Sequence, residues 1–208
     1  MNPEKLKIKS EKRIQSLGLE PNLNLPEIEN LNDLKFKTGE QIAKRILSLA
    51  YLYGISFNAS RKSIQNKLKE YGLIDELSNW ENKILTKKTL TKQDKVNIDW
   101  VTESIEVLGW AIGLWSEIPL LNECNEDRQA DNVPLNENPV KFITTAEIIP
   151  LNEIQEQADI IYRLHWIAKR TEIGKIGKHS NDVYMERHKA INWIIGLSKD
   201  WDTINTDT

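Results

Sequence analysis

Apolar residues recur three and four positions apart along most of the chain, which is the spacing of one buried face of an α-helix. The pattern is clearest where Thr38 and Gln41 are spaced as a capping box and apolar positions then continue to Gly54. Ser78 and Glu81 form a second such pair ahead of a short apolar stripe. The same periodicity covers residues 10–17, 60–71, 91–115, 152–171 and 182–197.

Strand signals are weak. Alternation of apolar and polar residues is limited to the brief stretches Leu6-Lys7-Ile8 and Phe142-Ile143-Thr144, and no repeat of fixed period is present. The length of 208 residues is close to that of one domain, at about 150 residues per domain. We therefore expect an all-α fold, a single compact helical domain of six or seven helices over residues 1–208.

Two segments between the predicted helices lack periodicity. Prolines interrupt residues 19–37 and residues 116–141, so both are expected to be irregular connections. The C-terminal tail, residues 198–208, is polar but contains Trp201, which is too apolar to be left in water. We expect this tail to fold back on the last two helices, with Asp202 or Asp207 pairing with Arg163 or Arg187.

Composition narrows the class of protein. Lys and Arg number 28 and Asp and Glu number 31, so the net charge of −3 argues against a nucleic-acid-binding protein. The N-terminal residues 1–14 interleave charges without the apolar core of a signal peptide. The longest uncharged apolar run, Val107 to Trp115, is far shorter than the roughly 20 residues of a spanning helix. A cytoplasmic protein without membrane contact is expected.

Charge is concentrated in the second irregular connection. Residues 117–140 contain six acids and one base, Arg128, which gives a local net charge of −5. The segment is either a solvated surface loop or a surface for a basic protein partner, because such charge steers association. The acids expected to form that surface are Glu123, Glu126, Asp127 and Asp131.

The C-terminal half resembles a known family. The resemblance lies in the segments from Ala158 to Trp166 and from Tyr184 to Ile194, in Trp201-Asp202 and in the ending Thr206-Asp207-Thr208. It extends upstream to Leu25-Pro26, to residues 40–45 and to residues 108–114, and so covers nearly the whole chain. These segments are similar to domain of unknown function 4272. The resemblance implies a soluble, mostly bacterial, helical domain without an established activity.

The candidate site residues are polar side chains of the last two predicted helices. They are Arg163, His165, Glu186, Arg187, His188 and Asn192. If the two helices pack side by side, Arg163, His165, Glu186 and His188 are expected to meet. One reading is a buried network that fixes how the helices dock. In the other, a histidine acts as general base, Glu186 orients it and an arginine holds an anionic substrate.

Catalytic motifs and metal-ligand spacings are missing. The sequence contains neither His-Glu-x-x-His nor a nucleophile elbow, and its three histidines share no ligand spacing on one helix, so we expect no metal and no cofactor. The expected turn with Gly174 and Gly177 has two residues between its glycines, where a phosphate loop has four. Cys124 is the single cysteine, which excludes an intramolecular disulfide, and the neighbouring Glu123 and Glu126 disfavour a nucleophilic thiolate.

Three functions follow as hypotheses. The first is a partner-binding protein without catalytic activity, for example an immunity-type or neutralising protein that uses its acidic loop. The alternative is an enzyme or a binder of a small anionic ligand that uses the Arg163, His165, Glu186, Arg187 and His188 cluster. The third is a self-assembling subunit with contacts around Trp110 and Trp115, and the sequence leaves the oligomeric state open.

Overall fold

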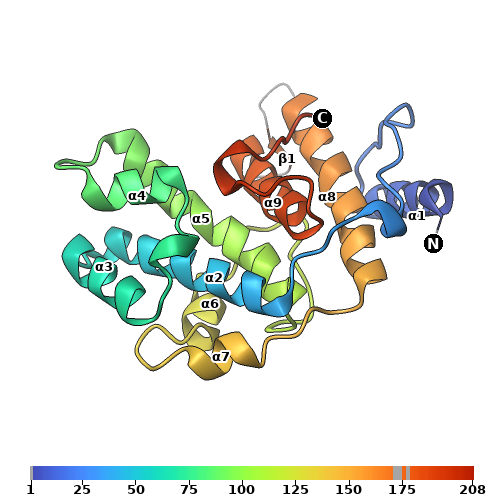
Figure 1. Cartoon of the computed structure of the whole chain (residues 1–208). Helices are drawn as coiled ribbons and strands as arrows, with labels where there is room; N and C mark the ends of the chain where they lie inside the picture. The colour runs from blue at the N-terminus through green and yellow to red at the C-terminus, as the bar shows by residue number, and fades with distance from the viewer. Residues whose placement is uncertain (1, 171–174, 177–178) are drawn as a thin grey trace.

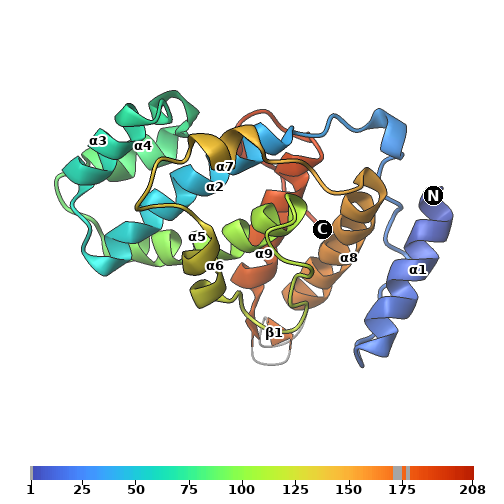
Figure 2. The ribbon, with the colours of Figure 1, turned by 90° about the horizontal axis from the view of Figure 1, so that it is seen from below.

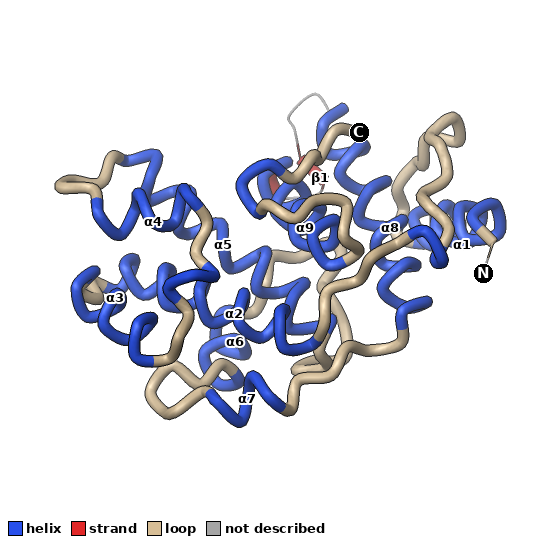
Figure 3. Tube along the Cα trace, viewed as in Figure 1, coloured by secondary structure: helices blue, strands red, loops and turns tan. Residues whose placement is uncertain are grey.

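The structure, a computed structural model, describes residues 2–170, 175–176 and 179–208. Helices dominate this part of the chain, and two strands of two residues each pair antiparallel (Figures 1 and 3). The all-α prediction is confirmed, and the expected turn with Gly174 and Gly177 lies outside the described residues. The elements are α1 (Pro3–Ser16), η1 (Leu31–Asp33), α2 (Gly39–Tyr53), η2 (Gly54–Phe57), α3 (Arg61–Glu70), η3 (Ile74–Glu76), α4 (Asn79–Thr86), α5 (Lys92–Ala111), α6 (Glu126–Asn132), α7 (Val140–Thr144), α8 (Leu151–Arg170), β1 (Lys175–Ile176), β2 (His179–Ser180), α9 (Asn181–Ile194) and η4 (Trp201–Thr203).

The long helices pack in a row. Helix α2 lies against α5, α5 against α9, α9 against α8, and α8 against α1. Helices α3 and α4 lie at the α2 end of this row, and α1 closes the opposite end (Figures 1 and 2). The described helices include none with the length and apolar character that crossing a membrane requires.

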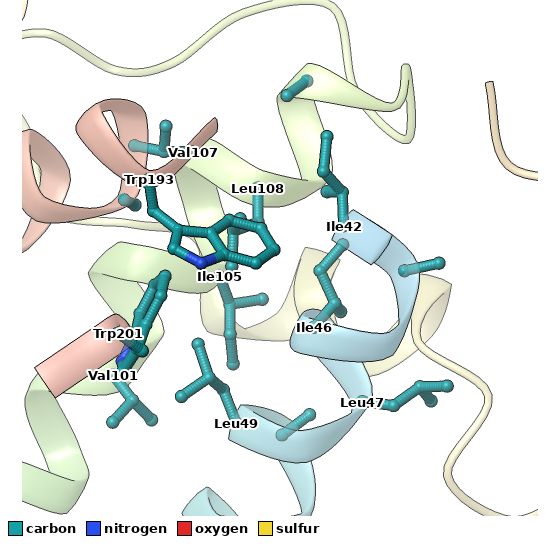
Figure 4. Packing of buried hydrophobic residues seen from close by; sticks show 14 of the residues in the cluster. Ile42, Ile46, Leu47, Leu49, Val101, Ile105, Val107, Leu108, Trp193 and Trp201 are labelled. Carbon is teal, nitrogen blue, oxygen red and sulfur yellow. The ribbon is translucent and has the colours of Figure 1, made fainter. Parts of the chain in front are cut away.

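The larger hydrophobic core lies between α2, α5 and α9 (Figure 4). Ile42 and Ile46 of α2 face Ile105 of α5, and Trp193 of α9 lies over the same core. Trp201 packs on Trp193 edge to face, with 5.5 Å between ring centroids. A smaller cluster joins α1 to α8 and α9.

Capping chemistry fixes several helix ends. The capping boxes at Thr38 and Ser78 are both present, as predicted. Helix α1 begins at Pro3 rather than near residue 10, because Asn2 caps it and proline fits the first turn. Helix α8 begins at Leu151, one residue before the predicted start, and the amide of Gln155 donates to the Glu29 carbonyl at 2.7 Å.

The longest predicted helix ends four residues early. Helix α5 stops at Ala111 because Gly113 has a φ of 72°, and the chain then turns back. The turn lays the Trp115 indole against α5 where Gly109 lacks a side chain; a Cβ there would be 2.1 Å from the ring. The Trp115 Nε1–H donates to the Glu106 carbonyl at 2.9 Å. Gly109 therefore provides the close approach that the ring requires.

The connection over residues 116–141 is not irregular throughout, contrary to the prediction. It contains α6 and begins α7, which together raise the number of α-helices in the described residues to nine. Asn125 caps α6, because its side-chain oxygen accepts from the Arg128 N–H at 2.9 Å. The connection over residues 19–37 contains only η1.

The C-terminal tail folds back on α9, one of the two helices predicted, and also contacts α2 and α4. Trp201 is 4% exposed, and the cationic groups of Arg45 and Lys189 each lie over its ring, 5.0 Å from the centroid. The expected ion pair of Asp202 or Asp207 with Arg163 or Arg187 is not formed, because those arginines pair with Asp159, Glu11 and Glu103. The Asp202 carboxylate instead accepts from the backbone N–H of Trp80 at 2.8 Å, at the start of α4.

Candidate functional site

The polar residues of α8 and α9 occupy several separate places. Arg163 faces α1 and is fully buried. Its Nε and Nη2 donate to the two carboxylate oxygens of Asp159, both at 2.9 Å, and Nη2 also donates to the Pro26 carbonyl at 3.2 Å. Glu11 of α1 lies 3.6 Å from Nη1. The guanidinium therefore joins α8 to α1 and to the segment before η1.

His165 and His188 do meet, between α8 and α9. Their Nδ1 atoms are 3.0 Å apart, so one ring donates and the other accepts, and the two neutral rings hold opposite tautomers. Burial lowers the pKa of His165 to about 4. Burial, with the neighbouring His165 and Lys169, lowers the pKa of His188 to about 3. Both rings are therefore neutral at pH 7 and act as a buried hydrogen-bonded contact.

Arg187 points to the other side of α9. Its Nε and Nη2 lie 2.8 Å and 2.7 Å from the same oxygen of Glu103, a buried residue of α5. Nη1 donates to the Pro119 carbonyl at 2.5 Å, and Nη2 donates to the Asn122 carbonyl at 2.7 Å. Arg187 thus holds the segment that follows α5, which leads into the acidic connection.

The expected meeting of Arg163, His165, Glu186 and His188 is limited to the two histidines. Residues two positions apart on a helix point to opposite sides, which separates Arg163 from His165 and Glu186 from His188. The Glu186 carboxylate accepts from the Ser104 hydroxyl at 2.9 Å. Asn192 donates to the Asn205 carbonyl at 2.9 Å and so fastens the C-terminal tail. Glu186 also lines a mixed-charge pocket beside Trp80.

The acidic connection forms one wall of a cavity of about 690 Å³. The other wall is α5, whose residues from Val96 to Glu103 include the carboxylate of Asp99 and the indole of Trp100. Half of the lining residues carry carboxylates, and no lysine or arginine of the described residues lines the cavity. The five acids are Asp99, Glu103, Glu123, Glu126 and Asp127.

Three of the four predicted partner-surface acids therefore share one cavity. Asp131 lies one helical turn after Asp127 on the exposed side of α6 and does not line it. Sequence reasoning missed the contribution of α5. Asp99 and Trp100 precede Glu123 by more than twenty residues, and only the packing of α6 on α5 brings them together.

Buried polar contacts fix the wall of this cavity. The carboxylate of Glu103 accepts from the Cys124 N–H at 3.0 Å while it pairs with Arg187. Glu106, also buried, accepts from the Gln129 amide at 3.0 Å and pairs with Arg128. The two glutamates of α5 therefore tie down the acidic connection at two points.

The cavity disfavours a nucleophilic thiol, as the sequence suggests. Burial, and after it the charge of Glu103, raises the pKa of Cys124 to about 12. The thiol is therefore protonated at pH 7 and poorly nucleophilic.

Burial and a hydrogen bond to Glu126 also raise the pKa of Tyr53, whose hydroxyl donates to that carboxylate at 2.8 Å.

The described side chains offer no obvious metal centre. Among residues 2–170 and the described positions after them, no group of three or more His, Cys, Asp or Glu is arranged to hold a metal ion. The five acids of the cavity are spread along its walls rather than converging on one point, which suits several cationic groups better than one ion.

Comparison with known proteins identifies the family. The family model described as a domain of unknown function, DUF4272, matches residues 6–204, so the chain belongs to that family. No curated protein and no solved structure matches the chain.

Proposed function

We propose that this member of the DUF4272 family is a non-catalytic protein of the bacterial cytoplasm that binds a basic protein partner through the acidic cavity between α5 and α6. The observation that carries the proposal is the cavity of about 690 Å³ whose lining contains five carboxylates and a tryptophan. Lysine and arginine side chains of a partner fit such a lining, because the carboxylates pair with their charges and the Trp100 ring offers a cation–π contact. An immunity-type or neutralising role is one form of this function.

The surroundings of the cavity favour binding over chemistry. Its single thiol is protonated at pH 7, its buried acid Glu103 is already engaged by Arg187, and Glu106, which lies behind the wall, is engaged by Arg128. These contacts also hold the wall in place before a partner arrives. Such preorganisation lowers the entropy lost on binding.

The anionic-ligand alternative receives less support from the geometry. Arg163 and Arg187 donate to buried carboxylates and to backbone carbonyls, so an anion would have to displace those partners. His165 and His188 are buried and bonded to each other. A general base must reach its substrate, and neither ring is open to one.

The proposal is tested with a fluorescein-labelled peptide of alternating lysine and serine, measured by fluorescence anisotropy at low and high salt. We expect binding that weakens as salt rises, because exposed charge pairs are screened. A variant that neutralises the predicted surface carries four substitutions, Glu123→Gln, Glu126→Gln, Asp127→Asn and Asp131→Asn. It should bind about tenfold more weakly, since each exposed pair contributes roughly 0.2–1 kcal/mol.

The matched control removes the same number of negative charges elsewhere on the surface. It carries Glu4→Gln, Glu20→Gln, Asp33→Asn and Asp75→Asn, all at exposed positions outside the cavity. At a salt concentration that screens the general change in net charge, the control should bind the peptide with the same affinity as the wild type. Equal weakening in both variants contradicts a specific acidic surface, and so does the absence of any binding by the wild type.

A further inference from the structure

A second, apolar cavity of about 400 Å³ opens beside the acidic one. It lies between the end of α2, α5 and α6, and two acids, Glu126 and Asp127, belong to the lining of both cavities. Its remaining lining is mainly apolar. The side chains that form it include Ala50, Phe57, Ile105, Ala130, Val133 and Leu135.

Phe57 lines this cavity, and most of its side chain is exposed to solvent. It is 69% exposed, the largest exposed fraction among the large hydrophobic side chains of the described residues. The ring is held in place: it packs edge to face on Tyr53 at 5.2 Å, and Asn58 ends the η2 turn with a φ of 63°. Burying such a ring removes a large apolar surface from water, so its position favours a partner that covers it.

We infer that the occupant is a segment of the basic partner that places an aromatic or branched aliphatic side chain in the apolar cavity and adjacent lysines or arginines in the acidic cavity. The inference rests on the proposed function and specifies the partner's contact segment. Charge complementarity carries it, because Glu126 and Asp127 place carboxylates at the edge of the apolar cavity. On a helical segment, apolar and basic residues three or four positions apart lie close enough to enter both cavities.

The test compares two synthetic peptides of equal length with identical lysines. In the first, leucines occupy helical positions three and four apart; in the second, serines replace the leucines. Anisotropy of the labelled peptides is measured with the wild-type chain. We expect the leucine peptide to bind at least about tenfold more tightly, which is the effect of burying one apolar side chain.

Two variants test whether the difference in affinity between the two peptides arises at the apolar cavity. Phe57→Ala removes one wall of the apolar cavity, and Ala130→Leu fills part of its space. Each should reduce the preference for the leucine peptide severalfold and leave the serine peptide unaffected. Leu23→Ala is the matched control, because Leu23 is 61% exposed and lies outside both cavities.

The outcomes separate the two proposals. Equal affinity for the two peptides, or a preference that survives in both variants, overturns the apolar part and leaves the acidic surface standing. Binding of neither peptide overturns both proposals. If light scattering finds a dimer of the wild type that Phe57→Ala dissociates, the apolar cavity is occupied by a second copy of the chain, and the inference is wrong.

Discussion

Acidification is expected to destabilise the protein through His165 and His188. The two rings are 2% and 4% exposed, and their pKa values of about 4 and about 3 lie well below the ordinary 6.5. A histidine with a lowered pKa in the folded state binds fewer protons when folded than when unfolded. Its stabilising contribution is therefore complete above about pH 6.5 and is lost as the pH falls toward the folded pKa.

The size of the loss follows from the unfolded chain. Between about pH 7.5 and about pH 5, each histidine becomes protonated in the unfolded chain but stays neutral in the folded one, and this costs about 2 kcal/mol per ring. The pair therefore accounts for a loss of about 4 kcal/mol in the free energy of unfolding over this range. That is a large fraction of the roughly 5–15 kcal/mol that stabilises a typical domain.

The assay is urea denaturation at both pH values, followed by tryptophan fluorescence. The variant His188→Gln cannot be protonated, while its amide can still hydrogen-bond to His165. Its loss of unfolding free energy on acidification should be smaller than that of the wild type by about 2 kcal/mol. Tyr162→Phe is the control, since Tyr162 packs on the His188 ring, at 5.7 Å between centroids, and both histidines remain. An equal pH dependence in the wild type and in His188→Gln would refute the reasoning.

Four other experiments test the fold and the surroundings of the site. Trp201→Ala should lower the free energy of unfolding by about 3–5 kcal/mol, and removal of residues 199–208 should lower the thermal midpoint by several degrees; an unchanged midpoint contradicts docking of the tail. Cys124 should react with iodoacetamide far more slowly at neutral pH than a free cysteine does, because its thiol has a pKa of about 12, and equal rates would show the thiol to be open. Arg187→Met leaves the Glu103 carboxylate buried without its cation, so urea denaturation should show a loss of about 3–5 kcal/mol, whereas a loss below about 1 kcal/mol contradicts the pairing.

Local signals predicted much of the helical framework. The hydroxyls of Thr38 and Ser78 accept backbone N–H bonds three residues ahead, as their spacing indicated, because a capping box depends on neighbouring residues alone. Helix α6 escaped prediction because six of its seven residues are polar and the helix has no apolar stripe. It is stabilised by distant contacts instead: Gln129 donates to the carbonyl of Thr102 at 2.9 Å and to the carboxylate of Glu106.

The candidate site depends on packing even more strongly. Charge along the chain identified Glu123, Glu126 and Asp127, but their partners in the cavity, Asp99 and Trp100, come from a helix with no sequence signal for that role. Arg187 was placed in a cluster with histidines and instead holds the start of the acidic connection. Which side of a helix meets which neighbour is a tertiary property, and periodicity alone does not determine it.

The central claim is that the acidic cavity binds a basic partner. It is tested most directly by a nuclear magnetic resonance titration of the protein with the lysine–serine peptide. The indole N–H groups of the seven tryptophans are distinct probes, and among them Trp100 lines the acidic cavity whereas Trp193 lies in the core. Titration should shift the Trp100 indole signal and leave the Trp193 signal in place, and high salt should reverse the shift. A peptide that binds without moving the Trp100 signal would contradict the proposed surface.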